Sequence, residues 1–325
     1  MRYRKLGKWG LRLSTIGLGS YLTFGHSLDL TDSRAVVRKA YDCGVNFFDT
    51  ADIYAFGRAE EALGKCLCEF KRSSYVLLTK CWERMSEEIN DEGLSAKHLY
   101  ESCHRSLKRL GTDYLDVFMC HRPDPETPLE ETIRALEDLA QQGKILYWGV
   151  SEWPAHLIVR ANRIAGEVGA ISISISQPQY SLLYRYPERN LFPATQAEGI
   201  GNVVYSALAQ GLLSGKYKPG EDAPQGSRGA DDRSNFELNQ LYMSEDNKIK
   251  SLKFSELARE MNVTPAQLAI AWCLRNPAVS SVISGAVNTT QVEENIAAGN
   301  LIIPEDTAAE IERIFPPVET VECES

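Results

Sequence analysis

Residues 46–54 read NFFDTADIY, and the fold prediction starts from this stretch. Its aromatic residues lead to Asp49, and Tyr54 follows five residues later. Short runs rich in aromatic and β-branched residues are typical of β-strands. A strand that ends on a carboxylate and is soon followed by a phenol carries two ionisable groups at its C-terminal end. In a barrel of parallel strands those ends converge on one mouth, where active sites lie.

Two further runs repeat this arrangement. YVLLTK (75–80) ends on Lys80, and LDVFMCH (115–121) ends on His121. Three successive predicted strands therefore bring a carboxylate, a phenol, an ammonium and an imidazole to the same mouth. We interpret these four side chains as a catalytic set that surrounds one small molecule.

The rest of the chain alternates between strands and helices in the same way. Further strand-like runs are LSTIGLGS (13–20), ILYWGVS (145–151), ISISISQ (171–177), GNVVYSAL (201–208) and SSVISGA (280–286). Helical periodicity separates them, as in the apolar series Leu99, Cys103, Leu107 and Leu110. Glycines, which tolerate the left-handed conformation, stand before the next strand at Gly44, Gly111, Gly143, Gly169 and Gly199.

Capping residues mark the starts of two helices. Thr127-Pro128-Leu129-Glu130 and Thr264-Pro265-Ala266-Gln267 each predict an N-cap threonine, a proline at the first helical position and a partner that completes a capping box. Eight strand-then-helix units result. The predicted fold is therefore α/β, a (β/α)8 TIM barrel, with residues 1–325 as a single domain.

Three segments lie outside this repeat. About 250 residues suffice for such a barrel, and the chain has 325. Residues 1–14 are expected to form a hairpin before the first barrel strand, residues 215–262 an insertion after the seventh, and residues 304–317 an extra C-terminal helix. The insertion opens with a long polar stretch rich in Gly and Pro, a kind that is usually functional or disordered.

Composition excludes several classes of protein. Hydrophobic residues make up 43% and charged residues 24%, as in ordinary globular proteins. No apolar run is long enough to span a membrane, and MRYRKLGKWG lacks the apolar core of a signal peptide. We therefore expect a cytoplasmic protein. Lys and Arg total 35 against 44 Asp and Glu, and the formal charge of −9 argues against nucleic acid as a partner. The eight cysteines lack a CxxC spacing and are expected to be reduced.

The four ionisable residues suit proton transfer to an oxygen. An unperturbed tyrosine has a pKa of about 10, and a nearby ammonium lowers it, a role expected of Lys80. Asp49 would hold Lys80 charged and oriented, while His121 would donate a hydrogen bond to a substrate carbonyl. Tyr54 is then the acid that protonates the carbonyl oxygen.

The motifs around these residues resemble the aldo-keto reductases, NADPH-dependent barrels with an Asp, Tyr, Lys, His tetrad. FDTADIY, TK and CHRPDP carry the tetrad in the same order. The likeness continues through WGVS (148–151), YSALAQGLLSGKY (205–217) and VISGAVNTTQVEENI (282–296), and so covers nearly the whole chain. RPDPETPLEET and LAIAWCLRNPAVSSV are most similar to the branch that contains the voltage-gated potassium channel β subunits.

The resemblance implies a mechanism and a set of cofactor contacts. Hydride would pass from the nicotinamide of NADPH to a carbonyl carbon while Tyr54 gives the oxygen its proton. The implied contacts are Gly19, Ser20, Tyr21, Asp49 and Gly285 at strand ends, Ser151 and Gln177 for the carboxamide, Tyr205 for ring stacking, Ser206, Ala207, Leu208, Gln210, Lys216 and Arg228 for the pyrophosphate, and Gln291, Glu294 and Asn295 for the adenosine. The last three share one helix face near an N-terminus that favours phosphate.

The cofactor preference is specified less closely. No GxGxxG occurs, only Gly17-Leu18-Gly19, which disfavours a Rossmann dehydrogenase. Val287 stands where relatives often carry a small polar residue near the adenosine phosphate, and Ala207 stands where proline is common. These two departures weaken the expectation that NADPH is preferred over NADH.

Each catalytic assignment has a structural alternative. Asp49 can cap the turn after its strand, Lys80 can be a solvated strand end, and His121 can serve the fold. A metal site needs more ligands than His121 supplies, so none is predicted. Asp52 stays outside the catalytic set, and Asp116 is assigned to the fold.

The sequence predicts the roles of three aromatic residues and of the remaining histidines less definitely than those of the four catalytic candidates. Tyr21, Trp82 and Trp153 follow the first, third and fifth strands, and they either wall the substrate pocket or pack under loops. The other histidines are expected on loops or helix surfaces: His26, His98, His104 and His156.

The favoured function is an NADPH-dependent reductase of aldehydes, with ketones as an extension. One alternative is an NADPH-binding redox sensor that docks on a membrane channel. Two features argue against this channel partner. Channel subunits often lose the histidine of the tetrad, whereas His121 is present here, and a barrel that begins almost at Met1 leaves no room for an N-terminal inactivation peptide. The other alternative is a Schiff-base aldolase with Lys80 as its nucleophile. Assembly into a homo-oligomer stays open.

Overall fold

Eight parallel strands close into a barrel in the computed structural model, which describes residues 1–231 and 235–317. The order around the barrel is β10-β3-β4-β5-β6-β7-β8-β9. The strands are β3 (Ile16–Gly19), β4 (Phe47–Asp49), β5 (Val76–Cys81), β6 (Leu115–Cys120), β7 (Ile145–Ser151), β8 (Ile175–Gln177), β9 (Gly201–Val204) and β10 (Val279–Ser284). The predicted (β/α)8 barrel is confirmed.

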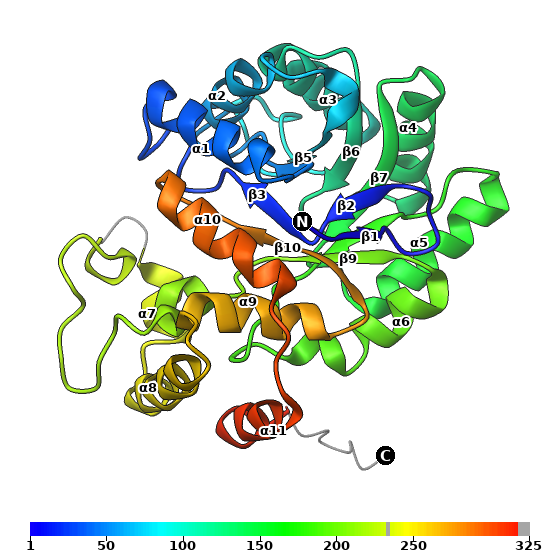
Figure 1. The fold of residues 1–325 in the computed structure, drawn as a ribbon. Coiled ribbons are helices and arrows are strands. Elements are labelled where there is room, and N and C mark those ends of the chain that lie inside the picture. Colours follow the sequence, from blue (N-terminus) through cyan, green and yellow to red (C-terminus); the bar gives the residue numbers. More distant parts are fainter. Residues whose placement is uncertain (232–234, 318–325) are drawn as a thin grey trace, which may run out of the picture.

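Helices join each strand to the next along the outside of the barrel (Figure 1). They are α1 (Leu30–Asp42), α2 (Arg58–Leu67), α3 (Ala96–Leu110), α4 (Leu129–Gln141), α5 (Ala155–Val168), α6 (Leu191–Glu198), α9 (Pro265–Arg275) and α10 (Thr289–Ala297). Single 3-10 turns occur at η1 (Arg72–Ser74), η2 (Tyr186–Glu188), η4 (Arg228–Ala230) and η5 (Ala298–Asn300). Among the helices of the described residues, none has both the length and the apolar character that a membrane crossing needs.

The predicted N-terminal hairpin is present and closes one end of the barrel. It consists of β1 (Tyr3–Lys5) and β2 (Arg12–Ser14), and Figure 1 shows it in dark blue across the strands. Leu6 and Leu13 are fully buried and cluster with barrel-interior residues such as Phe47 and Val117. The hairpin therefore extends the core of the barrel on the side opposite the strand C-termini.

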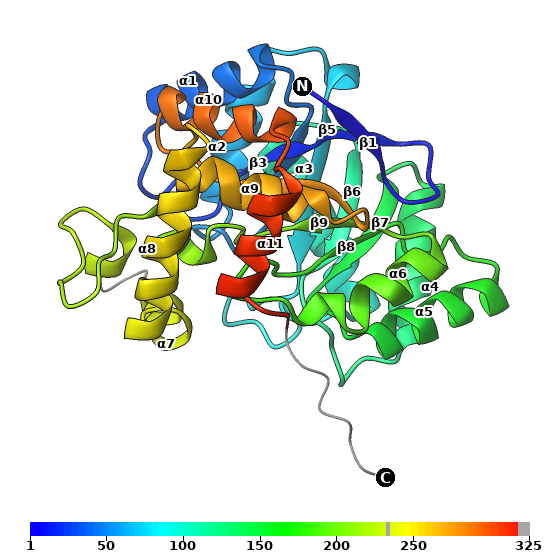
Figure 2. The same ribbon diagram turned by 60° about the horizontal axis from the view of Figure 1, so that its bottom comes forward.

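The insertion after β9 and the C-terminal helix pack against each other. The insertion follows η3 (Ala209–Ser214) and includes α7 (Phe236–Leu241) and α8 (Glu245–Glu260). Figures 1 and 2 show its first loop projecting away from the barrel. The helix α11 (Glu305–Ile314) lies beside α8 (Figure 2), and the ring centroids of Phe254 and Phe315 are 5.8 Å apart. Both predicted decorations are confirmed.

Several barrel strands are shorter than predicted, and in β8 and β9 the backbone shows the reason. In ISISISQ, the backbone N–H groups of Ile171 and Ile173 donate to side-chain oxygens of Glu137 and Asn162 at 2.7 and 2.9 Å, so the ladder starts only at β8. In GNVVYSAL, the strand β9 ends at Val204, because Ser206 adopts a positive φ of 61° that a strand cannot continue through.

The two predicted capping boxes have different outcomes. At α9 the box is present, since Gln267 N donates to Thr264 Oγ1 at 3.2 Å and Thr264 N donates to Gln267 Oε1 at 3.0 Å. At α4 the prediction is wrong. There the Thr127 hydroxyl donates to Asp124 Oδ2 at 2.7 Å instead, and Pro128 occupies the N-cap position.

Thr264→Ala should lower the free energy of unfolding by about 1 kcal/mol, because it leaves an N-terminal N–H of α9 without its acceptor. Urea unfolding followed by circular dichroism measures the loss. Thr264→Ser is the matched control, since it keeps the hydroxyl and should retain most of the stability. Equal midpoints for the two variants would mean that the capping box contributes nothing.

The structure also decides two side-chain assignments. His98 was expected on a surface, but it is fully buried on α3 together with Ser102, and its Nδ1 lies 3.4 Å from Asp91 Oδ1. The expectation failed because the buried face of α3 includes polar residues such as His98 and Ser102 in addition to its apolar residues. Asp116 serves the fold as predicted. Its Oδ2 accepts from Arg72 Nη2 at 2.6 Å and from Leu77 N at 2.9 Å.

Candidate active site

Neighbouring strands bring the four predicted catalytic side chains to one end of the barrel. Asp49 is the last residue of β4, and Lys80 is the penultimate residue of β5. His121 directly follows β6, in which Met119 is paired with Lys80. Tyr54 lies in the turn between β4 and α2. The side chains meet because the parallel register aligns the C-terminal ends of these strands.

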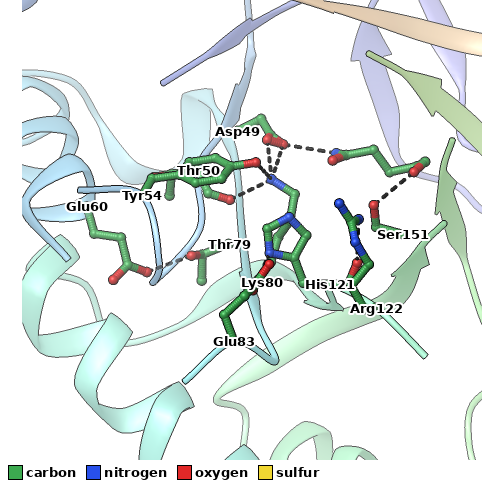
Figure 3. A network of polar contacts seen from close by, with 11 residues as sticks. Asp49, Thr50, Tyr54, Glu60, Thr79, Lys80, Glu83, His121, Arg122 and Ser151 are labelled. Atoms are coloured by element: carbon green, nitrogen blue, oxygen red, sulfur yellow. Dashed lines mark hydrogen bonds and ion pairs between the residues drawn. The ribbon is translucent and has the colours of Figure 1, made fainter. Parts of the chain in front are cut away.

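The Lys80 ammonium is the centre of the cluster (Figure 3). It donates to both carboxylate oxygens of Asp49 at 2.7 and 2.6 Å and to the Thr50 carbonyl at 2.8 Å. Its Nζ is also 3.3 Å from the Tyr54 hydroxyl. Lys80 is 0% exposed and Asp49 is 3% exposed, so the pair is shielded from water. A solvated strand end, the alternative for Lys80, is therefore wrong.

The acidity expected of Tyr54 is not what the surroundings produce. Burial and the Asp49 carboxylate raise the pKa of Tyr54 well above its ordinary value. Lys80 does not reverse this direction, because Asp49 accepts from its ammonium with both oxygens and burial lowers the pKa of Lys80. The expectation of a Tyr54 pKa below its ordinary value is therefore wrong, although the Lys80 charge still offsets part of the effect of Asp49. Tyr54 instead retains its proton at neutral pH, as a proton donor must.

An unusual backbone follows Tyr54. The next three residues, Ala55, Phe56 and Gly57, all have positive φ, of 51°, 53° and 85°. Only glycine adopts this region readily, so Ala55 and Phe56 are strained, and such strain is often found at functional sites. The turn reverses the chain so that α2 begins at Arg58, directly after Tyr54 has reached the cluster.

His121 contacts a residue that sequence reasoning did not identify. Its Nδ1 lies 2.8 Å from Glu83 Oε2, and its ring centroid is 5.7 Å from that of Tyr54. Burial lowers the pKa of His121. Against the effect of burial, the hydrogen bond with His121 holds the pKa of Glu83 below its usual range. The available signal was an acid three positions after Lys80 in a loop rich in acids.

A separate group of buried acids lies behind the cluster. Asp52 Oδ2 accepts from Ser102 Oγ at 2.8 Å, and burial and the nearby Glu60 raise the pKa of Asp52 to about 8. Glu60 accepts from Thr79 Oγ1 at 2.6 Å (Figure 3). It also accepts from Arg109 Nε at 2.5 Å. These contacts join α2 and α3 to β5, so Asp52 and Glu60 hold the barrel wall together.

Two residues predicted to bind the nicotinamide carboxamide lie against the cluster. Gln177 Nε2 donates to Asp49 Oδ1 at 2.9 Å. Ser151 Oγ donates to the Gln177 carbonyl at 3.0 Å. They end the adjacent strands β7 and β8, whose register pairs Ser151 with Gln177. The Gln177 amide thus contacts the Asp49 carboxylate, and the Ser151 hydroxyl stands next to Gln177.

The residues after β3 lie on the other side of Asp49. Ser20 N donates to the Asp49 carbonyl at 3.0 Å, directly after Gly19. The Ser20 hydroxyl is buried and has no hydrogen-bond partner within the described part of the chain. Tyr21 is half exposed, and its ring centroid is 4.9 Å from that of Tyr54. Tyr21 therefore flanks the phenol, as a substrate-pocket wall would.

The segment after β9 has a strained backbone. Three of its non-glycine residues have positive φ: Ser206, Ala209 and Gln210. The other predicted contacts here vary in burial, because Ala207 is buried, Tyr205 and Leu208 are half-buried, and Lys216 is exposed. Arg228 is half-buried in η4, within the insertion.

The residues predicted to contact the adenosine of the cofactor lie on α10, next to the loop after β10. Gly285 directly follows β10, and its carbonyl accepts from Asn295 Nδ2 at 3.2 Å. Gln291 Oε1 accepts from Val287 N at 3.0 Å. Glu294 is half-buried on the same helix, whose N-cap is Asn288. The start of α10 and the loop after β10 are therefore joined by these side chains.

Together these residues fit a phosphate-bearing nicotinamide dinucleotide. Amide and hydroxyl groups stand beside the tetrad, an unpartnered buried hydroxyl is present at Ser20, and Tyr205 supplies an aromatic ring. Lys216 and Arg228 add positive charge, and α10 contributes a helix N-terminus, which favours phosphate.

The two tryptophans differ in their surroundings. Trp82 is half-buried directly before Glu83. Trp153 is only 2% exposed, and its indole N–H has no hydrogen-bond partner among residues 1–231 and 235–317. A buried indole N–H usually finds a partner, whereas Trp153 packs in the core cluster with this donor unpartnered among the described residues.

Comparisons with known proteins give a family and two relatives. A profile described as "Aldo/keto reductase family" matches residues 15–315. A protein of Arabidopsis thaliana named "Probable voltage-gated potassium channel subunit beta" is 43% identical over 307 residues, 93% of this chain and 92% of that protein. A protein of Oryza sativa subsp. japonica with the same name is 42% identical over 306 residues, with 93% and 92% covered. The similarity to the channel β-subunit branch is thereby confirmed.

Proposed function

Because the chain belongs to the aldo/keto reductase family, we propose that it reduces aldehydes, and by extension ketones, with NADPH. The family generally binds NAD(P)H. The observation that carries the proposal is the Lys80 ammonium, held by Asp49 at 2.6 Å and placed 3.3 Å from the Tyr54 hydroxyl. A half-buried phenol beside an oriented ammonium suits a general acid in carbonyl reduction.

Each residue has a distinct task in this proposal. When bound, the reduced nicotinamide supplies the hydride for the carbonyl carbon. Tyr54 gives its proton to the carbonyl oxygen, and Lys80 stabilises the phenolate that remains. Asp49 fixes the position of Lys80. Ser151 and Gln177 would hold the carboxamide, Tyr205 would stack on the ring, and Lys216 and Arg228 would bind phosphate.

An NADPH-consumption screen tests the proposal. Purified protein is mixed with aliphatic, aromatic, sugar and dicarbonyl aldehydes, and the alcohol formed is quantified. We expect at least one class to yield alcohol in a one-to-one ratio with the NADPH consumed. If the protein binds NADPH but produces no alcohol from any class, the reductase proposal is wrong.

The names of the relatives favour a second candidate function, an NADPH-binding regulatory subunit of a potassium channel. Both plant relatives are named as channel β subunits and match 93% of this chain. This candidate predicts tight NADPH binding with little turnover, together with co-purification with a channel. Turnover of a good aldehyde by the purified chain separates it from the reductase.

The Schiff-base aldolase fits the cluster less well. The Lys80 ammonium donates to Asp49 and to the Thr50 carbonyl, and the side chain is fully buried. A nucleophilic amine has to lose its proton and reach the substrate. Borohydride in the presence of an aldehyde should therefore trap no adduct on Lys80.

Arg228→Ala should weaken NADPH binding by about 1.5–3 kcal/mol, the usual range for a hydrogen bond to a charged group. Arg228 lies in η4, on the insertion, and a guanidinium on such a loop could close over a phosphate. Titration of tryptophan fluorescence with NADPH and NADH measures the change. If Arg228 binds the 2′-phosphate, only NADPH weakens. If it binds the pyrophosphate, both cofactors weaken.

Lys218→Ala is the matched control, because Lys218 is an exposed cation in the same insertion, 3.9 Å from Glu221. It should leave both dissociation constants unchanged. Unaltered dissociation constants in Arg228→Ala would remove Arg228 from the site.

A further inference from the structure

Glu83 and His121 form a hydrogen-bonded contact at the mouth that the proposed mechanism leaves unused. They follow β5 and β6, which pair in parallel up to Cys81 and Cys120. The His121 side chain is 7% exposed and the Glu83 side chain 25% exposed. Figure 3 shows Glu83 on the opposite side of the imidazole from Asp49. The 2.8 Å contact is thus built into the wall of the site.

The contact decides which imidazole nitrogen carries the proton. An ionised carboxylate only accepts hydrogen bonds, so His121 Nδ1 must be the donor to Glu83. A neutral imidazole then has a bare Nε2, which accepts but cannot donate. Donation from Nε2 to a substrate carbonyl requires the positively charged form of His121. The hydrogen bond from His121 to a substrate carbonyl, which the sequence predicts, is therefore possible only while the imidazole is positively charged.

The charged groups around His121 act in opposite directions. Lys80 on β5 and Arg122, its own neighbour, disfavour a positive imidazolium, and burial does the same. Asp49 on β4 is paired with Lys80, and Tyr54 approaches with its ring. Glu83 favours the charged form through both its hydrogen bond and its charge. Within the described residues it is the acid in direct contact with the ring.

We propose that Glu83 is a positioning residue that fixes the Nδ1–H form of His121 and stabilises its charged state, so that Nε2 donates to the carbonyl oxygen only while His121 is protonated. The inference rests on the proposed reductase function. Tyr54 still transfers the proton and His121 transfers none, so Nε2–H only stabilises the developing negative charge. The reduction rate should then fall as His121 loses its proton.

The charge state can be measured without turnover. Protein labelled with ¹³C-histidine is titrated by NMR in the absence of cofactor, and the His121 signal is identified by its loss in His121→Asn. In Glu83→Gln the His121 midpoint should move down by about 1 pH unit or more, because an opposite charge at contact distance is removed. Glu83→Asp keeps the carboxylate and should keep most of the wild-type midpoint. An unchanged midpoint in Glu83→Gln overturns the proposal.

The pH dependence of the rate gives the second readout. With saturating NADPH and a good aldehyde, the wild-type rate should fall with rising pH at the His121 midpoint seen by NMR. In Glu83→Gln this limb should move to lower pH by the same amount, with the NADPH dissociation constant unchanged. If the rate limb of Glu83→Gln stays at the wild-type pH while its NMR midpoint moves, the charge of His121 does not control the rate, and this part of the proposal is wrong. If the wild-type protein shows no turnover, only the proposed reductase function is wrong. The NMR titration still tests whether Glu83 stabilises the charged form of His121.

Discussion

Replacing Tyr54 by Phe should reduce the rate of aldehyde reduction by about 10²- to 10⁴-fold, the range typical of a lost general acid. The variant removes one hydroxyl and keeps the ring that contacts Tyr21 and His121. The fold and NADPH binding should therefore survive. Steady-state turnover measures the loss, and fluorescence titration measures NADPH binding in the same preparation.

Tyr147→Phe is the matched control. Tyr147 lies on β7, and its ring centroid is 5.8 Å from that of Trp9 in the hairpin loop, at the end of the barrel away from the cluster. It loses the same hydroxyl and should keep the parent rate. If Tyr54→Phe also reduces a good aldehyde at the parent rate, the proton comes from another group, and charged His121 becomes the first candidate.

Lys80→Met should have the second large effect, acting on the rate and on its pH dependence. Removing the ammonium leaves the Asp49 carboxylate uncompensated near Tyr54, which raises the pKa of Tyr54 further. The phenol loses its proton at higher pH, so the part of the rate profile that Tyr54 sets, at higher pH than the His121 limb, moves upward. Residual activity falls because nothing stabilises the phenolate. An unchanged rate and profile would mean that another group activates Tyr54.

The same substitution tests the fold, because it breaks a fully buried ion pair. Loss of one partner typically costs about 3–5 kcal/mol, since the other charge stays buried. The double variant Asp49→Asn with Lys80→Met removes both charges and should recover much of this stability. It should not recover activity. Thermal melts and turnover on the same samples separate a damaged site from a damaged fold.

The fold was predictable because the chain repeats one local pattern. Strand-like runs, helical periodicity and glycines before the next strand occur in alternation, and each is a local signal. The tetrad followed from the same signal, because parallel strands bring their C-terminal ends together without further information. Asp49 and Lys80 could thus be placed in one site from two short runs of sequence.

The charge states could not be predicted, because they depend on burial and on loop paths. The acidity of Tyr54 was misjudged because the sequence does not say that Asp49 accepts from Lys80 with both oxygens. Glu83 was missed because its contact with His121 depends on the path of the loop after β5. His98 was placed on the surface because a histidine at the start of a helix carries no local sign of burial.

The hairpin that closes the barrel also sets when the barrel can fold. Arg4 donates to the Val279 carbonyl at 2.6 Å, and Ser280 donates to the Lys5 carbonyl at 3.0 Å, each across 275 positions of the chain. Residues 4 and 5 can therefore meet these partners only after residues 279 and 280 have been synthesised. Contacts of such sequence separation form slowly, because a long loop loses entropy before the contact stabilises it. A chain that stops before residue 279 keeps an open edge on β3, which can pair with another chain and aggregate.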